Sequence, residues 1–113
     1  YDSEDDILFF TKGKPSKYSI EIADFILDVD NKDSLVGIEI LNASQALGIP
    51  KGLLASLEYA KVKTEATPNA LYVKFLFAAA GQAPQMVQVP LLPASKREPL
   101  LVSSWTDYPT IPA

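Results

Sequence analysis

The sequence predicts a single α+β domain, mainly β: an antiparallel sheet of about six to eight strands with one short helical segment near residues 43–57. Two observations predict this class. Apolar and polar residues alternate with a period of two through most of the chain, as in half-buried strands. Only the segment 43–57 carries helix start and stop signals. A length of 113 residues suffices for one small domain with its own core.

The first half is expected to fold as an antiparallel meander. Its expected strands are 7–10, 18–22, 25–30 and 35–41. Ile7–Phe10 is continuously apolar, which indicates a strand covered at least partly on both faces. In the last strand Val36, Ile38 and Ile40 lie on one face and Glu39 on the other. The turn before it, residues 31–34, contains Asn, Asp and Ser, whose side chains bond their own backbone.

Helical signals follow this strand. Asn42 or Ser44 can cap a short helix that runs through Leu47 and ends at Gly48. Pro50 suits the first position of a second helical turn. We therefore expect helix between the two halves of the sheet.

The second half returns to strands. The expected strands are 59–66, 71–77 and 86–89, with turns near Pro68 and at Gly81–Pro84. Pro90 has no N–H to donate to a neighbouring strand, so the strand that it follows is expected at an edge of the sheet. Residues 58–98 thus supply further strands, which either complete the sheet of residues 1–47 or make an oligomer.

Residues 99–113 form a proline-rich arm that is too apolar for a free tail. It is expected to pack either on its own domain or on a neighbouring subunit. Its candidate interface residues are Leu101, Trp105, Tyr108 and Ile111.

The absence of Cys and His excludes several chemistries. It excludes zinc sites of the usual N/S type, thiolate nucleophiles and a Ser-His-Asp relay. We predict no catalytic residues, no metal site and no cofactor; an enzyme would have to use carboxylates, Lys or Tyr. The lack of cysteine leans weakly toward a cytoplasmic protein, and no apolar run approaches the roughly 18 residues of a membrane helix. The chain starts at Tyr1 rather than Met, which is compatible with a trimmed N-terminus.

Charge is distributed unevenly along the chain. Residues 1–50 carry ten acids against four lysines, whereas residues 51–113 carry six bases against four acids. With no dense basic stripe, nucleic-acid binding is disfavoured. The acidic half is either simply solvated or suited to a positively charged protein partner.

Glu39 is the carboxylate of most interest, because it interrupts an otherwise apolar strand. Gly37 beside it would leave space for a ligand or for a partner's basic side chain; alternatively, Glu39 pairs with a cross-strand lysine. The predicted ligand-binding residues are Glu39, Asn42 and Ser44. Free N–H groups at the helix start would there favour an anion.

Two segments carry a family resemblance: the opening Tyr1-Asp2 with Asp6-Ile7-Leu8-Phe9-Phe10, and Val36–Ser44. Over about residues 1–47 the chain resembles an uncharacterised family of small bacterial and archaeal proteins, domain of unknown function 2283. The resemblance implies a compact antiparallel domain without an established activity. Because some such genes lie beside genes for toxin-like proteins, it also implies an antitoxin-like role as one form of function.

Together these features predict a non-enzymatic module that self-associates as a homo-oligomer or binds a small protein partner. The alternatives are a small-ligand or anion-binding module and, less favoured, a carboxylate-dependent enzyme.

The arm provides the first test. If it lies between subunits, deletion of residues 99–113 should lower the mass of the oligomer measured by native mass spectrometry. An unchanged mass would remove the arm from the interface.

Overall fold

A computed structural model describes residues 1–32, 34–66, 68, 70–93 and 106–109. Within these residues the chain forms eight antiparallel strands and two short helices, which confirms the predicted class. The strands are β1 (Leu8–Thr11), β2 (Tyr18–Ile22), β3 (Phe25–Val29), β4 (Leu35–Ile40), β5 (Leu57–Ala66), β6 (Ala70–Ala79), β7 (Gln85–Pro93) and β8 (Thr106–Pro109). The helices are α1 (Ala43–Leu47) and α2 (Lys51–Ala55).

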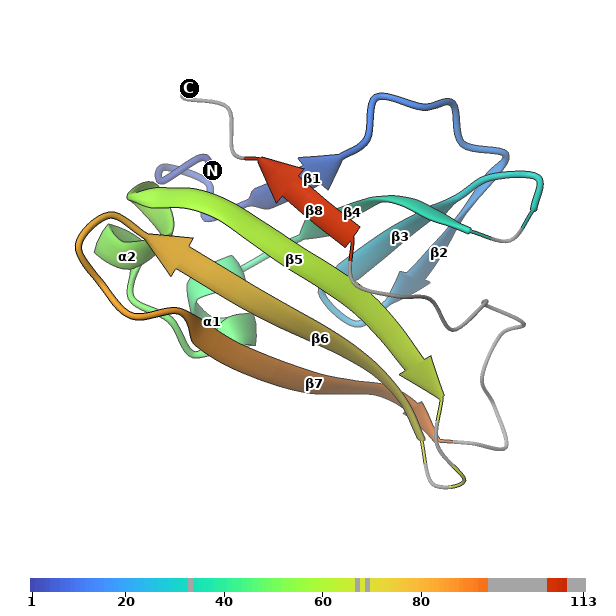
Figure 1. The fold of residues 1–113 in the computed structure, drawn as a ribbon. Helices are drawn as coiled ribbons and strands as arrows, with labels where there is room; N and C mark the ends of the chain where they lie inside the picture. The colour runs from blue at the N-terminus through green and yellow to red at the C-terminus, as the bar shows by residue number, and fades with distance from the viewer. Residues whose placement is uncertain (33, 67, 69, 94–105, 110–113) are drawn as a thin grey trace.

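The strands form two sheets, with orders β1-β4-β3-β2 and β7-β6-β5-β8 (Figure 1). Each sheet comes from one half of the chain. In each sheet, hairpins connect three consecutive strands into a meander. The fourth strand pairs with one edge strand of this meander, as in a Greek key. The predicted meander therefore covers β2–β4 but not β1, which pairs with β4. Residues 12–17, which include Gly13 and Pro15, make a connection too long for a tight hairpin between β1 and β2.

The two sheets pack face to face around an aromatic cluster. Phe10 and Phe25 come from the first sheet, and Phe75 and Phe77 come from neighbouring inward positions of β6. The centroids of Phe75 and Phe77 lie 5.4 Å apart, and Phe10 lies 6.2 Å from Phe77. Phe25 lies 6.3 Å from Phe75. These contacts join both inner faces into one core.

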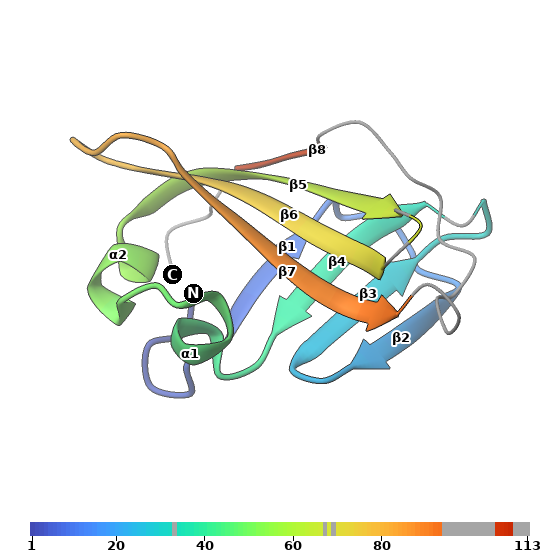
Figure 2. The same cartoon turned by 90° about the horizontal axis from the view of Figure 1, so that it is seen from below.

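The helices lie together beside one end of the sandwich (Figure 2). They contribute Leu47 and Leu54 to the core, and Ile49 between them is also buried. Gly48 adopts φ 66 and its N–H bonds to the carbonyl of Gln45, so α1 ends where the sequence predicts. Pro50 precedes α2 as its N-terminal flanking residue, one position earlier than predicted.

The two edge strands of the second sheet, β7 and β8, test two predictions made from the sequence. β7 lies at an edge, which confirms the prediction made from Pro90. β8 occupies the other edge, where Tyr108 is in register with Ala60 of β5. This part of the arm packs on its own domain. Leu101, Trp105 and Ile111 lie outside the described residues.

A pair of phenylalanine substitutions tests the core. Phe75→Ala should lower the free energy of unfolding by about 3–5 kcal/mol, because Phe75 is fully buried among three other rings. Phe9→Ala is the matched control. Its side chain is 52% exposed, so its substitution should cost much less. Urea unfolding measures both, and equal losses would contradict this assignment of the core.

Candidate functional site

The outer face of the first sheet, here called the acidic face, consists of the outward residues of β1–β4. Strand register arranges them in two rows. One row is Phe9, Glu39, Ile26 and Glu21, and the next is Thr11, Gly37, Asp28 and Ser19. All charged residues in these rows are carboxylates, and β1–β4 contain no Lys or Arg.

Glu39 lies on this face, opposite to the buried Ile38 and Ile40, as the sequence predicts. Its cross-strand neighbours are Phe9 and Ile26, so no lysine stands opposite it. Among the described residues the Glu39 side chain makes no hydrogen bond or ion pair. Glu39 is thus a half-buried carboxylate that lies between two apolar side chains.

The sequence predicts that Gly37 leaves space for a ligand or a partner, but the structure shows another reason for glycine at this position. It faces Asp28 across the β3–β4 pair. A Cβ on residue 37 would stand 3.1 Å from Asp28 Oδ2 and 3.3 Å from the carbonyl of Phe10. The space is filled by the Asp28 carboxylate, whose Oδ1 accepts a 2.6 Å hydrogen bond from Ser19 Oγ. Gly37 therefore accommodates a side chain of this chain rather than a ligand.

Phe9 lies on the less covered face of the first strand, for which the sequence predicts at least partial cover on both faces. Leu8 and Phe10 are buried, but Phe9 is 52% exposed. Beside it lies a cavity of about 520 Å³ lined by Tyr1, Asp2, Ser3, Ile7 and Phe9. Phe9 therefore places an exposed aromatic ring at the rim of this cavity.

A second polar cluster joins the N-terminus to α1. Tyr1 Oη donates a 2.6 Å hydrogen bond to Asp6 Oδ1, and Ser44 Oγ donates one of 2.6 Å to Asp6 Oδ2. The backbone N–H of Ser44 also donates to the Asp6 carboxylate, at 3.0 Å to Oδ1. Asp6 thus supplies, from 38 residues away, the anion that the sequence places at this helix start.

Asn42 and Ser44, which the sequence predicts to bind a ligand together with Glu39, therefore make other contacts than expected. Ser44 is already engaged by Asp6, and Asn42 makes no side-chain cap but donates from Nδ2 to Asp24 Oδ1 at 3.3 Å. Glu39 lies on the outer sheet face rather than in this cluster. Hydrogen bonds from Ser44 and then Tyr1 lower the pKa of Asp6. Burial and the bond to Asp6 raise the pKa of Tyr1 from 10.0 to about 12.

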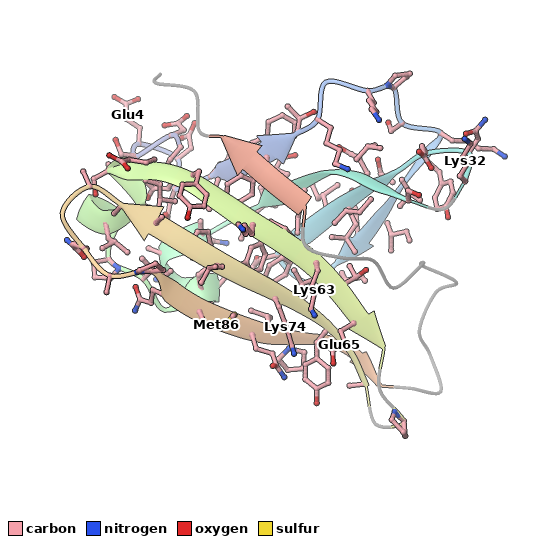
Figure 3. The ribbon with its side chains drawn as sticks, viewed as in Figure 1. Glu4, Lys32, Lys63, Glu65, Lys74 and Met86 are labelled. Atoms are coloured by element: carbon pink, nitrogen blue, oxygen red, sulfur yellow. The ribbon has the colours of Figure 1, made fainter. Side chains whose placement is uncertain are left out.

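The outer face of the second sheet, here called the mixed face, carries charges of both signs. Lys61, Lys63, Lys74 and Glu65 point outward from β5 and β6, and Glu58 near the start of β5 is also exposed. Figure 3 shows Lys63, Lys74 and Glu65 together. Glu65 Oε2 lies 2.7 Å from Lys74 Nζ and 3.7 Å from Lys63 Nζ. Its pKa is lowered chiefly by the hydrogen bond from Lys74. Lys61 lies in register with Asp107 of β8.

Exposed large apolar side chains occur on these same two faces. Among the described residues they are Phe9 at 52%, Met86 at 55% and Tyr59 at 36% exposure. Phe9 belongs to the acidic face. Met86 and Tyr59 belong to the mixed face, where Met86 shares a row with Leu76, Lys61 and Asp107. Both faces therefore expose apolar side chains, but only on the acidic face are the charged residues of the strands all of one sign.

Other candidate sites are less developed. In the hairpin after β3, Asp30 Oδ1 accepts hydrogen bonds from the N–H groups of Lys32 and Ser34, which hold its pKa low. The described residues contain no group of three or more acids suited to a metal ion. No helix in the described part of the chain is long and apolar enough to cross a membrane.

Sequence reasoning missed two of these features. Phe9 lies in an apolar run. Its ring is exposed because no described part of the chain packs over it. Asp6 looked like one more residue of an acidic run. The signal that could have singled it out was its place in the segment of the family resemblance, together with Tyr1 and Ser44.

Comparison with known proteins confirms the resemblance over the first part of the chain. Residues 1–44 match the family described as "Protein of unknown function (DUF2283)". An uncharacterised protein from Methanocaldococcus jannaschii is 40% identical over 52 residues, 45% of each chain. A protein from Methanosarcina mazei, named "Putative hypoxanthine phosphoribosyltransferase", is 37% identical over 67 residues, 58% of this chain and 54% of that protein. The aligned parts span about half the length of these relatives, and no solved structure matches.

The hydrogen bonds to Asp6 predict a pH dependence. Because its pKa is lower in the folded chain, Asp6 stabilises the fold above the unfolded-state value of 3.8, and this stabilisation is lost as the pH falls through the folded value. Asp6→Asn should lower the melting temperature at pH 7, with a smaller difference from wild type below about pH 4. Asp5→Asn is the control, since Asp5 is an exposed neighbour with the same charge. A pH-independent difference for Asp6→Asn would refute a role for the ionised carboxylate.

Proposed function

We propose that this chain is a non-enzymatic interaction module that binds a protein through its acidic face. The observation that carries the proposal is the juxtaposition of Phe9, half exposed, with Glu39, which has no ionic partner among the described residues. An aromatic side chain that becomes buried on binding supplies affinity. A carboxylate beside it selects a positively charged partner and sets its orientation.

The surroundings of this pair support the same proposal. Ile26 extends the apolar surface on the other side of Glu39, and the cavity beside Phe9 offers space for a partner's side chain. Glu21 and Asp28 keep the sign of the charge uniform across the sheet. A basic protein surface with exposed apolar side chains is the complementary partner. An antitoxin-like role is the special case in which that partner is a small toxin.

The anion-binding alternative has less support. It needs unoccupied N–H groups at the start of α1, and the Ser44 N–H is bonded to the Asp6 carboxylate. The name of the Methanosarcina mazei relative is not transferred to this chain, which covers 54% of that protein.

The proposal is tested by capture from a lysate of the organism that makes the protein, using the tagged full chain. We expect one stoichiometric polypeptide, either a second copy or another protein. Phe9→Ser should weaken its binding by about 2 kcal/mol, roughly 30-fold in Kd, and Glu39→Lys should weaken it as well. Gln82→Ser, an exposed change in the β6–β7 turn, is the control. Capture that neither face variant reduces would refute binding through the acidic face.

A further inference from the structure

β2 differs from the other three outermost strands because no described feature closes its outer edge. β7 and β8 both contain proline, which has no N–H to offer a neighbouring strand. At the edge of β1, the chain's own Asp2 pairs with Ile7 through two backbone hydrogen bonds, of 2.9 and 3.2 Å. β2 contains no proline, and no described segment pairs with its outer edge (Figure 2).

The free backbone groups on this edge follow from the hairpin between β2 and β3. Its two-residue loop is closed by Ile22 opposite Phe25, and in an antiparallel pair the hydrogen-bonded residues alternate with residues that point away. Ile22 and every second residue of β2 before it therefore bond to β3. The N–H and C=O groups of Ser19 and Glu21 point outward from the edge of the sheet, and both residues are exposed.

Charged residues of opposite sign flank the two ends of β2. The loop before it, residues 12–17, carries Lys12, Lys14 and Lys17 and no acid, whereas residues 18–25 carry Glu21 and Asp24 and no base. Among the described residues none of these five side chains forms an ion pair. Such a segment is self-complementary when two copies of it run antiparallel, because the basic end of each then lies beside the acidic end of the other.

We infer that β2 pairs with β2 of a second copy of this chain, antiparallel and about a two-fold axis at Ile20. In this register Ser19 of each copy faces Glu21 of the other, so all the outward backbone groups of both strands are paired. Lys17 of each copy then lies beside Asp24 of the other copy. Ile20, which is half-buried at the margin of the core, meets its counterpart across the axis and loses its remaining exposure.

Charge favours this antiparallel arrangement. Each Glu21 has two diagonal neighbours on the opposing strand, Lys17 and Glu21 of the other copy. The two Lys17–Glu21 contacts of the dimer outnumber its single Glu21–Glu21 contact. A parallel pairing would instead place lysine beside lysine and acid beside acid.

The pairing joins two four-stranded sheets into one continuous sheet. It uses the open β2 edge of both copies, so association stops at the dimer. Phe9 lies on β1, at the other edge of the first sheet, and therefore stays accessible together with Glu39 in each copy. The inference is thus independent of the proposed function, whose partner occupies a different surface.

A matched pair of substitutions at Ser19 tests the backbone pairing by analytical ultracentrifugation of the full chain. We expect the wild type to dimerise at concentrations between about 0.01 and about 1 mM. Ser19→Pro removes an N–H that points away from β3, so it should weaken the dimer at least about tenfold and leave the β2–β3 hydrogen bonds in place. Ser19→Ala loses the same hydroxyl, which donates to Asp28, but keeps the N–H and should dimerise like the wild type. Circular dichroism and urea unfolding confirm that each variant is folded.

A charge exchange at two exposed positions provides a second test that does not depend on the proline variant. Lys17→Glu and Glu21→Lys should each weaken the dimer about tenfold, because every contact between positions 17 and 21 then joins like charges. An equimolar mixture of the two variants should form a complex of one copy of each, at least as tight as the wild-type dimer. In that complex the contacts between positions 17 and 21, and the contact between the two residues 21, all join opposite charges.

Three outcomes would overturn the inference. They are a wild type that stays monomeric up to about 1 mM, a folded Ser19→Pro variant that dimerises as tightly as Ser19→Ala, and a mixture of the charge variants that forms no complex. Phe9→Ser should leave the dimer unchanged, and Ser19→Pro should leave the capture of a host protein unchanged. A monomeric wild type that still captures a host protein through Phe9 would therefore refute the dimer and support the proposed function.

Discussion

The face-to-face packing of the two sheets through Phe10, Phe25, Phe75 and Phe77 is the contact on which the rest of the structure depends. Each sheet has one strongly apolar face, and the chain has no cysteine to form a disulfide that could hold a weaker core. Once the inner faces meet, strand alternation fixes every outward position. Phe9 projects outward because Leu8 and Phe10 on either side of it are buried, and Glu39 because Ile38 and Ile40 are.

The charge asymmetry of the sequence becomes an asymmetry in space because each sheet is contiguous in the chain. β1–β4 come from residues 8–40 and β5–β8 from residues 57–109. Both Greek keys close within their own half, and only the helical segment passes between them. The carboxylates of β2–β4 therefore lie together on the first sheet, and the lysines of the described strands all lie on the second.

Local sequence patterns predicted the elements well, since alternation, turn residues and Gly48 all act within a few residues. The edge position of β7 followed from the missing N–H of Pro90, and the outward direction of Glu39 from alternation alone. Alternation says which side chains share a face but not which strands are neighbours, so it gave neither the division into two sheets nor the pairing of β1 with β4. The predicted site was incomplete for the same reason. The bond between Asp6 and Ser44 spans 38 residues, and the fit of Gly37 to Asp28 depends on register.

The segment that matches the family has structural consequences of its own. Residues 1–44 contain the whole first sheet and the Asp6–Ser44 contact that fixes the start of α1. They do not contain a full cover for the inner face, where Leu27, Ile38 and Ile40 are buried in one core with residues of the helical segment and of β5 and β6. The matched segment therefore specifies the acidic face, while the second half of this chain completes the core. The acidic face can thus be shared with relatives that cover the inner face of the first sheet in another way.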